Sequence, residues 1–219
     1  LVLDDTMSIG YVGLVSCNNI SINNLTLNNK INGLFLMNTS YSTINNVKLY
    51  NNSQNGILLI YSSNNNIKNC IIYNNNWCGI DLHYSNNNII TFNNITSNNN
   101  DGLYLDDCDN NIITGNTISN SGYGIYLYSS DDNNIMVNNI SNNNVGLWLK
   151  YSSNNFMRNN TLQDNTYNFD VEGWDISHFY QDIDTSNTIN GKPIYYLMGK
   201  SNLVLDDTMS IGYVGLVSC

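Results

Sequence analysis

Short runs of alternating apolar and polar residues recur along the chain and are separated by Asn-rich stretches. The clearest run is Gly, an aliphatic residue, any residue and then Leu, and it begins at Gly33, Gly56, Gly79, Gly102, Gly124 and Gly146. From Gly33 to a degenerate copy at Asn168, successive copies are 23, 23, 23, 22, 22 and 22 residues apart. Apolar residues that alternate over three or four positions predict short strands, and a fixed period of this length predicts a solenoid.

Two further apolar columns run in phase with this Gly phrase. The first is predicted to comprise Ile20, Ile44, Ile67, Ile90, Ile113, Ile135 and Phe156. The second is predicted to comprise Leu25, Leu49, Ile72, Ile95, Ile118, Ile140 and Leu162. Each coil of 22–23 residues therefore offers three short strands, whose inward side chains form a continuous core when coils stack. The sequence predicts an all-β fold, a single-stranded parallel β-helix.

Polar residues recur in the same phase. An internal Asn ladder is predicted three residues after the first of these two columns, at Asn23, Asn93, Asn116, Asn138 and Asn159. Val47 and Cys70 take this position in two coils. A second column of small residues comprises Thr39, Ser62, Ser85, Cys108, Ser130 and Ser152. Stacked amides can bond to equivalents above and below, so we interpret both columns as structural.

A longer repeat overlies the short one. Residues 1–17 and residues 203–219 are identical, at an offset of 202 residues. We interpret them as the starts of two successive units of roughly nine coils each, with an artificial duplication as the alternative. The predicted organisation is a junction coil at 1–17, regular coils at 18–163, an irregular widened coil or loop at 164–202, and the start of the next unit at 203–219.

The irregular stretch 164–202 holds the only Glu and the only Pro of the chain, Glu172 and Pro193. The dipeptide Asn190-Gly191 predicts a hairpin turn between two strands. Because loops on rigid scaffolds often carry function, we expect neighbouring chains to dock at this stretch.

Charge and composition remove several classes of function. The formal net charge is −10, with seven Lys and Arg residues and no basic cluster. Nucleic-acid binding needs such residues to neutralise phosphates, so we expect no nucleic-acid partner. No apolar run approaches the ~18 residues that predict a membrane-spanning helix. Asn makes up about a fifth of the chain, yet the apolar columns in every coil argue against disorder.

The coil Gly-Ile-x-Leu…Ser-Ser-Asn-Asn…Ile…Asn-Asn-x-Ile, as at Gly56–Ile72, resembles the NosD-like, carbohydrate-binding-and-sugar-hydrolase type of parallel β-helix repeat. The segment from Asp184 to Tyr196 is similar to the linker between such blocks in archaeal cell-surface proteins. The resemblance covers essentially the whole chain. It implies a right-handed helix and an extracellular or cell-surface location. The coil itself serves many activities and does not specify one.

An aromatic stripe is predicted on the outer surface. The outward residue of the Gly phrase is Phe35, Leu58, Asp81, Tyr104, Tyr126, Trp148 and Asp170 in successive coils. We consider Phe35, Tyr104, Tyr126 and Trp148, together with Trp174 of the irregular stretch, as a surface for carbohydrate binding or chain–chain contact. Ordinary cross-strand stacking that stiffens the sheet is the alternative.

Acidic residues supply two further candidates. A group comprising Asp106, Asp107, Asp109 and Asp131 could bind Ca²⁺ through oxygen ligands, although a solvated acidic patch is the simpler interpretation. Asp81 and His83 lie one coil before Asp106 and form a loose acid–base constellation. No Arg lies near them to neutralise a substrate carboxylate. We therefore predict a protein that is not an enzyme and has no cofactor other than this calcium.

The cysteines predict no metal centre. Cys17, Cys70, Cys78 and Cys108 form no CxxC pair and have no His at zinc spacing. A disulfide between Cys70 and Cys78 is possible from the sequence. The copper that a NosD resemblance implies finds no matching cluster of Cys, His and Met.

These observations favour a structural extracellular protein, in which tandem β-helix units build a stiff cell-surface fibre, sheath or surface layer. Its partners would be further copies of itself, through tandem units and lateral contacts. The alternative is a carbohydrate-binding adhesin that uses the aromatic stripe on cell-surface glycans. A polysaccharide lyase or hydrolase is the third hypothesis.

Overall fold

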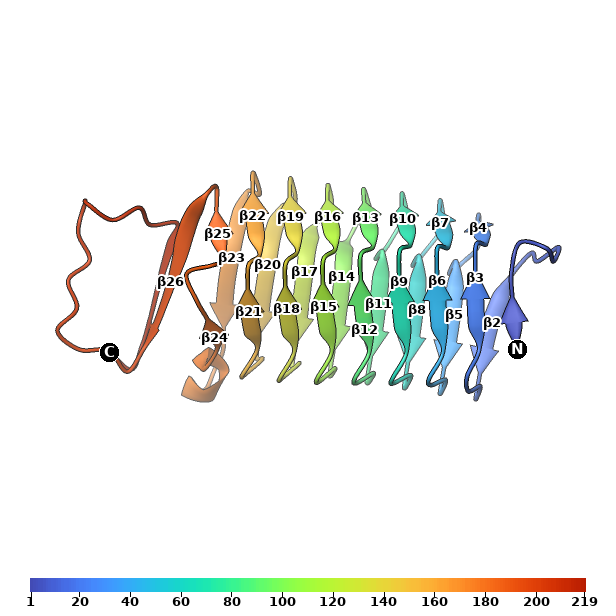
Figure 1. The fold of residues 1–219 in the computed structure, drawn as a ribbon, viewed down its shortest axis with the longest axis horizontal. Helices are drawn as coiled ribbons and strands as arrows, with labels where there is room; N and C mark the ends of the chain where they lie inside the picture. The colour runs from blue at the N-terminus through green and yellow to red at the C-terminus, as the bar shows by residue number, and fades with distance from the viewer.

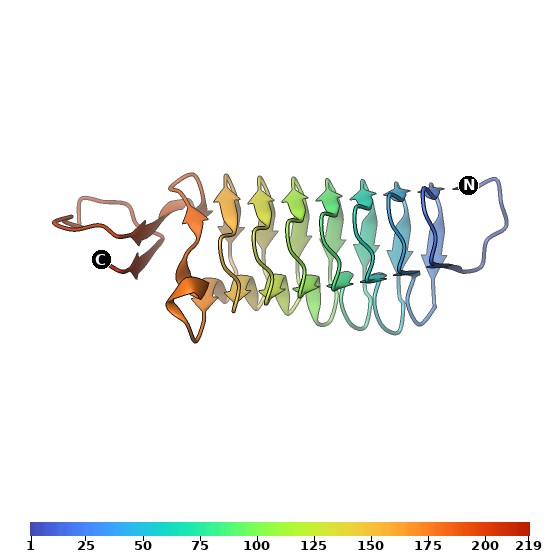
Figure 2. The same ribbon diagram turned by 90° about the horizontal axis from the view of Figure 1, so that it is seen from below.

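Three parallel sheets run the length of the molecule, and each coil contributes one short strand to each of them (Figures 1 and 2). The computed structural model describes residues 1–219. It is a right-handed parallel β-solenoid of about ten turns, so the predicted fold class is confirmed.

The strands of each sheet come from successive coils. The eight-stranded sheet contains β2 (Val12–Val15), β5 (Leu34–Met37), β8 (Ile57–Ile60), β11 (Ile80–His83), β14 (Asp101–Asp106), β17 (Tyr123–Tyr128), β20 (Val145–Lys150) and β23 (Tyr167–Glu172). The nine-stranded sheet contains β1 (Val2–Leu3), β3 (Ser21–Asn23), β6 (Thr43–Asn45), β9 (Asn66–Lys68), β12 (Ile89–Thr91), β15 (Ile112–Thr114), β18 (Asn134–Met136), β21 (Phe156–Arg158) and β24 (Asp182–Ile183). The ten-stranded sheet contains β4 (Thr26–Asn28), β7 (Lys48–Tyr50), β10 (Ile71–Tyr73), β13 (Asn94–Thr96), β16 (Thr117–Ser119), β19 (Asn139–Ser141), β22 (Thr161–Gln163), β25 (Thr188–Ile189), β26 (Lys192–Met198) and β27 (Tyr213–Val217).

The Gly phrase is explained by crowding of the backbone between coils. A Cβ atom on Gly102 would lie 2.3 Å from Ile118 Cγ2 and 2.7 Å from the carbonyl oxygen of Gly124. The glycines at the equivalent positions of the neighbouring coils have the same close contacts. Only Gly lets the chain turn from the third strand of one coil into the first strand of the next at this spacing. The inward Leu and Ile side chains beside it are fully buried and form one core cluster along the rod.

Asn side chains form three ladders inside the corners, where the sequence predicted one. In the predicted ladder, the backbone N–H of Asn93 donates to Asn116 Oδ1 at 2.9 Å, and that of Asn116 donates to Asn138 Oδ1 at 3.0 Å. The same contact joins Asn65 to Asn88 in a second ladder and Asn52 to Asn75 in a third. The Ser column bonds in the same way. Each ladder supplies an acceptor for a corner N–H that has no strand partner.

The predicted columns are wrong at their ends. Leu25 and Asn160 occupy the ladder position that the sequence assigned to Asn23 and Asn159. Asn159 is an exposed corner residue with φ 55°, a left-handed conformation that turns its side chain outward. The core columns shift correspondingly, since Ile22, Leu27 and Met157 are buried where Ile20, Leu25 and Phe156 were predicted. Runs of similar residues, such as Asn159-Asn160, leave such slips open in the sequence.

The last part of the chain departs from the coil. A short 3₁₀ helix, η1 (Ile176–Phe179), follows β23, and β26 runs antiparallel to β25. The turn between them contains Asn190 with φ 49° and Gly191 with φ 75°, so the predicted hairpin is confirmed. The strand β27 then pairs with β26 in parallel. The buried Ile194 of β26 covers the last coil, and the two strands lie beyond the regular stack in Figure 1.

All five cysteines are free thiols, so Cys70 and Cys78 do not form the disulfide that the sequence allowed. The Sγ of Cys70 lies 3.3 Å from the carbonyl oxygen of Lys68, and burial raises its pKa to about 11. Cys70 and Cys108 therefore act as small buried members of the Asn and Ser columns.

Candidate functional site

The outward face of the eight-stranded sheet carries the chemistry of this molecule. Alternate residues of each strand point away from the core, so two outward columns lie side by side. The first column contains Phe35, Leu58, Asp81, Tyr104, Tyr126, Trp148 and Asp170. The second contains Met37, Ile60, His83, Asp106, Tyr128, Lys150 and Glu172. The face is therefore apolar at one end, acidic near the middle and aromatic beyond that.

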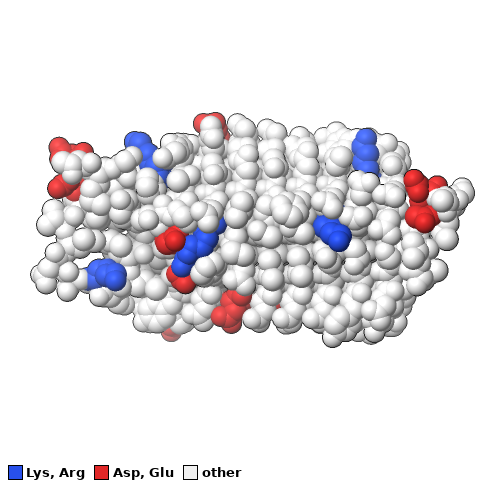
Figure 3. All heavy atoms as spheres, viewed as in Figure 1, with Lys and Arg blue, Asp and Glu red and all other residues white.

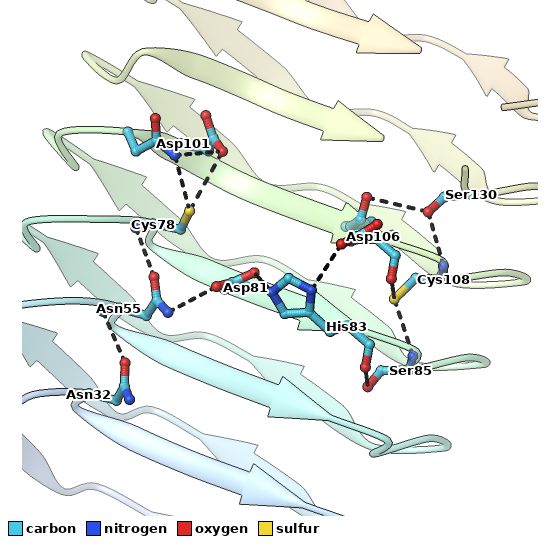
Figure 4. A network of polar contacts seen from close by, with 12 residues as sticks. Asn32, Asn55, Cys78, Asp81, His83, Ser85, Asp101, Asp106, Cys108 and Ser130 are labelled. Carbon is cyan, nitrogen blue, oxygen red and sulfur yellow. Dashed lines mark hydrogen bonds and ion pairs between the residues drawn. The ribbon is translucent and has the colours of Figure 1, made fainter. Parts of the chain in front are cut away.

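His83 joins two carboxylates from neighbouring coils (Figure 4). Its Nε2 lies 3.0 Å from Asp81 Oδ1, and its Nδ1 lies 3.2 Å from Asp106 Oδ2. The contact with Asp81 is the main reason why the pKa of His83 is raised, and the charge of Asp106 adds to it. Burial raises the pKa of Asp106, partly offset by His83. The loose acid–base constellation of the sequence is thus a connected set in which two members, His83 and Asp106, are partly exposed.

A buried polar network extends this set beneath the surface (Figure 4). Asn55 Nδ2 donates to Asp81 Oδ2 at 2.9 Å, which holds the Asp81 carboxylate in place. In the next coil, the Cys78 thiol lies 3.6 Å from Asp101 Oδ2. Burial raises the pKa of Asp101 to about 7, although the bond from Cys78 lowers it. Asp101 Oδ1 is buried and has no hydrogen-bond partner, which is a further reason why this carboxyl holds its proton more tightly than an exposed one.

The aromatic stripe begins beside His83. The ring centroids of Tyr104 and Tyr126 are 5.1 Å apart, and those of Tyr126 and Trp148 are 5.0 Å apart at an angle of 14°. Tyr123, at the start of β17, stacks on Trp148 at 5.4 Å. The ring of His83 meets the ring of Tyr104 edge-on at 5.8 Å. These side chains form one continuous surface from the acid–base set to Trp148, which we call the aromatic platform (Tyr104, Tyr123, Tyr126 and Trp148).

A shallow groove of about 490 Å³ adjoins the platform at its far end. Tyr123 and Trp148 line it together with Tyr167, Phe169 and Asp170 of or near β23. The Trp148 Nε1 atom is buried and has no acceptor in the protein. A buried N–H normally has a partner, so this donor is one of the few exceptions in the structure.

Phe35 and Trp174 lie outside the aromatic platform. Phe35 shares the outward column but is separated from Tyr104 by Leu58 and Asp81. Trp174 follows β23, is 86% exposed, and stacks on the corner residue Tyr151 at 5.8 Å.

The four predicted calcium ligands Asp106, Asp107, Asp109 and Asp131 do not converge. The structure contains no group of three or more His, Cys, Asp or Glu side chains arranged to hold a metal ion. Asp109 Oδ1 accepts the backbone N–H of Asp131 at 2.8 Å, Asp131 Oδ1 accepts the N–H of Ser153, and Asp106 bonds to His83. Asp109 and Asp131 thus act as acceptors at the corners and Asp106 as a partner of His83, and calcium binding by these residues stays a prediction.

Sequence reasoning missed the parts of the site that precede the Gly phrase. Asn55, Cys78, Asp101 and Tyr123 each stand immediately before one of its glycines. The signal was available, because this position changes in character from coil to coil while its neighbours repeat. The sequence did not show where the side chains at this position point, because only the stacking of coils shows that they lie beside the outward columns.

Cationic side chains are sparse on the outward columns. Figure 3 shows the side of the rod that faces the viewer in Figure 1, where the eight-stranded sheet lies at the back, and this side carries small scattered groups of acidic and basic residues. On the outward columns, the only cationic candidates are His83 and Lys150, and Lys150 Nζ lies 3.1 Å from Glu172. The helix in the structure, η1, has four residues and is far too short to span a membrane.

Several solved structures share this fold. The A-module of the Azotobacter vinelandii mannuronan C-5 epimerase AlgE4 aligns with a TM-score of 0.64 at 15% identity, covering 91% of this chain and 54% of that one. The periplasmic alginate epimerase AlgG aligns with a TM-score of 0.67 at 18% identity, covering 90% and 50%. The Dettilon tailspike protein gp208 aligns at 0.67 and 15%, covering 95% and 50%. At these identities the likeness establishes the fold, and this chain spans about half the length of those structures.

These comparisons correct one prediction. The sequence was interpreted as a protein that is not an enzyme, but the structures that share its fold include two carbohydrate epimerases. The absence of enzymatic activity is therefore not a valid inference from this coil. No curated protein matches the chain at a significant level.

A family model described as "Periplasmic copper-binding protein (NosD)" matches residues 50–199. The residues of this chain do not fit a copper site. The His83 nitrogens both face carboxylates, and the Cys78 and Cys108 thiols are buried, with pKa values raised by burial. Copper would require deprotonated, converging ligands, and none are gathered here. The family match itself covers more than half of the 219 residues, so the chain belongs to the NosD family.

Proposed function

We propose that the protein binds a neutral polysaccharide along the outward face of the eight-stranded sheet and acts on it through His83 and Asp106. The observation that carries this proposal is continuity. The aromatic platform leads without interruption to the one partly exposed acid–base pair on the same face.

Binding is assigned to the platform. Flat aromatic rings stack on the apolar faces of sugars, and stacked rings from successive coils repeat at the ~4.8 Å spacing of the strands. Trp148 also lines the adjoining groove, so its ring would contact a sugar that lies there. A chain lying along the rod axis would then pass from Trp148 over Tyr126 and Tyr104 towards His83.

The acid–base role is assigned to His83 and Asp106. The pKa of each group is raised, that of His83 mainly by its contact with Asp81 and that of Asp106 mainly by burial, so each holds a proton more tightly than the free side chain does. Asp81 is buried and does not reach the substrate; it orients His83 and is itself fixed by Asn55. In hydrolysis of a glycosidic bond, an acid protonates the leaving oxygen while a base takes a proton from the water that attacks the anomeric carbon, and protonated His83 and the Asp106 carboxylate would take these two roles. Hydrolysis is therefore the reaction class that we propose.

The charge of the face selects the substrate. A uronate chain brings a carboxylate on each sugar, which needs a cation to neutralise it. Here Asp81, Asp106, Asp170 and Glu172 lie on the same face, and Lys150 is already paired. We therefore propose a neutral glycan for this chain, in contrast to the mannuronan and alginate in the names of the two epimerases.

Three variants test this proposal. Trp148→Ala should weaken binding to neutral polysaccharides about tenfold, or ~1.4 kcal/mol, in affinity electrophoresis. His83→Gln should keep that affinity but abolish the release of reducing ends. Tyr50→Ala is the matched control, because Tyr50 stacks on Tyr73 at 5.0 Å on a different sheet. Equal losses in Trp148→Ala and Tyr50→Ala, or preferred binding of uronate polymers, would contradict the proposal.

A structural role in a cell-surface fibre, sheath or layer is the second candidate. The observation that favours it is the identity of residues 1–17 and 203–219, which is typical of tandem units. The family is described as periplasmic, which supports a location outside the cytoplasm. A stiff rod that also binds glycans would combine both functions: it would be a scaffold at the cell surface that acts on carbohydrates.

A further inference from the structure

A pair of stacked tyrosines lies on the corner that follows the eight-stranded sheet. Tyr61 directly follows β8 and Tyr84 directly follows β11, and their ring centroids are 5.0 Å apart at an angle of 15°. Both side chains are exposed, at 56% and 48%. The two rings therefore add little to the core, and they offer a flat apolar surface to the solvent.

The backbone at this corner is unfavourable for a tyrosine. Tyr61 has φ 49° and Tyr84 has φ 50°, which is the left-handed region. The equivalent left-handed position of the other coils holds Ser16, Asn38, Asp107, Ser129 and Tyr151. Asn and Asp adopt this conformation more easily than a residue with a bulky ring does. The exposed tyrosine pair thus has a conformational cost that burial does not offset, and such residues cluster at functional sites.

The tyrosine pair borders the acid–base pair. Tyr84 is the residue after His83, and its backbone N–H donates to the carbonyl oxygen of Asp106 at 3.0 Å. The negative charges of Asp107 and Asp106 raise the pKa of the Tyr84 hydroxyl, so this side chain lies within the electrostatic reach of both carboxylates. The pair and the acid–base residues therefore belong to one surface.

Aromatic rings flank the acid–base pair in both directions along the rod. Tyr61 lies one coil before His83, and Tyr104 of the aromatic platform lies one coil after it. A line from Trp148 to Tyr61 crosses the strands diagonally, from the first outward column to the corner, and passes His83. It spans four coil steps, or ~19 Å at ~4.8 Å per coil. A polysaccharide on this line would have sugars on both sides of the bond that faces His83 and Asp106.

We propose that Tyr61 and Tyr84 bind the sugars on the far side of the reacting bond, so that the protein cleaves neutral polysaccharides at internal bonds. This inference rests on the function proposed above and adds the second half of its binding surface. Stacked rings on the corner offer sugars the same kind of contact as the platform does. Attack at chain ends alone needs a barrier beyond the reacting bond, and here two exposed rings occupy that place.

The chemical step is the hydrolysis already assigned to His83 and Asp106. The bond between the anomeric carbon and the glycosidic oxygen breaks, and the oxygen takes the proton of His83. Water adds its hydroxyl group to the anomeric carbon and gives its other proton to the Asp106 carboxylate. This proton then returns to His83 across the 3.2 Å contact between the two side chains, which restores the starting state.

Asn substitutions remove the two rings without harm to the corner. Tyr61→Asn with Tyr84→Asn supplies the residue type that Asn38 has at this position, so the double variant should melt at the wild-type temperature or above it. With His83→Gln added to prevent turnover, its affinity should fall about tenfold in affinity electrophoresis with mannan, xylan or β-glucan, whichever the wild type binds best. Tyr41→Asn is the matched control, since Tyr41 is 61% exposed with φ 52° but lies three residues further along its corner.

The cleavage pattern tests internal attack. The wild type should halve the viscosity of the same polysaccharide before mono- or disaccharides appear, the double variant should release reducing ends about tenfold more slowly, and Tyr41→Asn should match the wild type. Unchanged affinity and rate in the double variant, or a viscosity that falls only as short sugars appear, would overturn this inference. Losses in Trp148→Ala and His83→Gln would then still support the proposed function. No release of reducing ends from any of the three polysaccharides would overturn both.

Discussion

The interior of the solenoid and the outward face of its eight-stranded sheet are built from the same repeat, yet only the interior repeats. Inside, the equivalent positions of successive coils hold Ile90, Ile113 and Ile135, or Asn93, Asn116 and Asn138. Outside, the corresponding run on one column is Leu58, Asp81, Tyr104, Tyr126 and Trp148.

The difference has a physical cause. An inward side chain touches its equivalents in the coils on either side, so a change leaves a cavity or an unpaired amide. An outward side chain meets solvent on one side and can change at little cost to the fold. In a solenoid, departures from the repeat on an otherwise regular sheet therefore mark chemistry, whereas the repeat itself marks stability.

A second outward face supports this interpretation. On the ten-stranded sheet, Tyr50 and Tyr73 stack at 5.0 Å with an angle of 6°, and Lys48 lies over both rings. No acidic or His side chain takes part in these contacts. Stacking there stiffens the sheet, and the acid–base set distinguishes the eight-stranded face from it.

The largest effect should come from breaking the interior at a glycine. Gly102→Val would place a branched side chain against Ile118 and the carbonyl oxygen of Gly124, both within 2.7 Å of a Cβ at this position. We expect a loss of more than about 4 kcal/mol in unfolding free energy, or no soluble protein. Urea denaturation measures it. Gly191→Val is the positional control, because a Cβ there contacts nothing within 4 Å although φ is 75°. Similar losses for both would show that backbone strain, rather than coil packing, dominates.

A smaller loss should follow from interrupting one Asn ladder. Asn116 accepts from the Asn93 backbone at 2.9 Å and donates to the Ile90 carbonyl oxygen at 2.9 Å. Asn116→Ala leaves these buried groups unpaired, so we expect a loss of about 3 kcal/mol in the free energy of unfolding. The exposed strand residue Asn94 provides the control, and Asn94→Ala should change stability by less than about 0.5 kcal/mol. Equal values would remove the distinction between inward and outward Asn.

The smallest effect should come from Asp101, which lies between the interior and the outward face, and this effect should depend on pH. The pKa of Asp101 is raised from 3.8 to about 7, so the folded state binds this proton more tightly than the unfolded state. The contribution of Asp101 to the stability of the wild type should therefore be greatest below pH ~4 and should fall as pH rises towards ~7. Asp101→Asn removes the titration, and we expect it to stabilise the protein by about 2 kcal/mol at pH 8 but not at pH 4.

Thermal melts of Asp101→Asn and wild type across that range measure the effect. Asp107 lies at an exposed corner and provides the control: Asp107→Asn should change the melting temperature by the same amount at pH 4 and at pH 8. If Asp101→Asn is equally destabilising at pH 4 and pH 8, Asp101 is ionised in the folded protein. Asp101 would then be part of the polar site and not part of the core.

Much of the fold was readable from spacing, and the site was readable only in fragments. Gly56 and Gly102 mark the coils because no other residue fits between the stacked strands. Asp81, His83 and Asp106 were visible as a loose constellation. Nothing in the sequence distinguished them from Asp107 and Asp109, which face solvent or a corner amide, because corner geometry depends on which residue takes the left-handed conformation.

By itself, the sequence determined the coil, its period, the three strands per turn and the column that carries the aromatic residues. These follow from local alternation and crowding, which are the same in every coil. Only the tertiary structure decided which side chains meet across coils: the His83 bridge, the buried carboxyl of Asp101, the free Trp148 N–H and the different faces of the two identical segments. Those contacts join residues about one coil apart in the chain, and a shift of one position reverses the face that a strand presents.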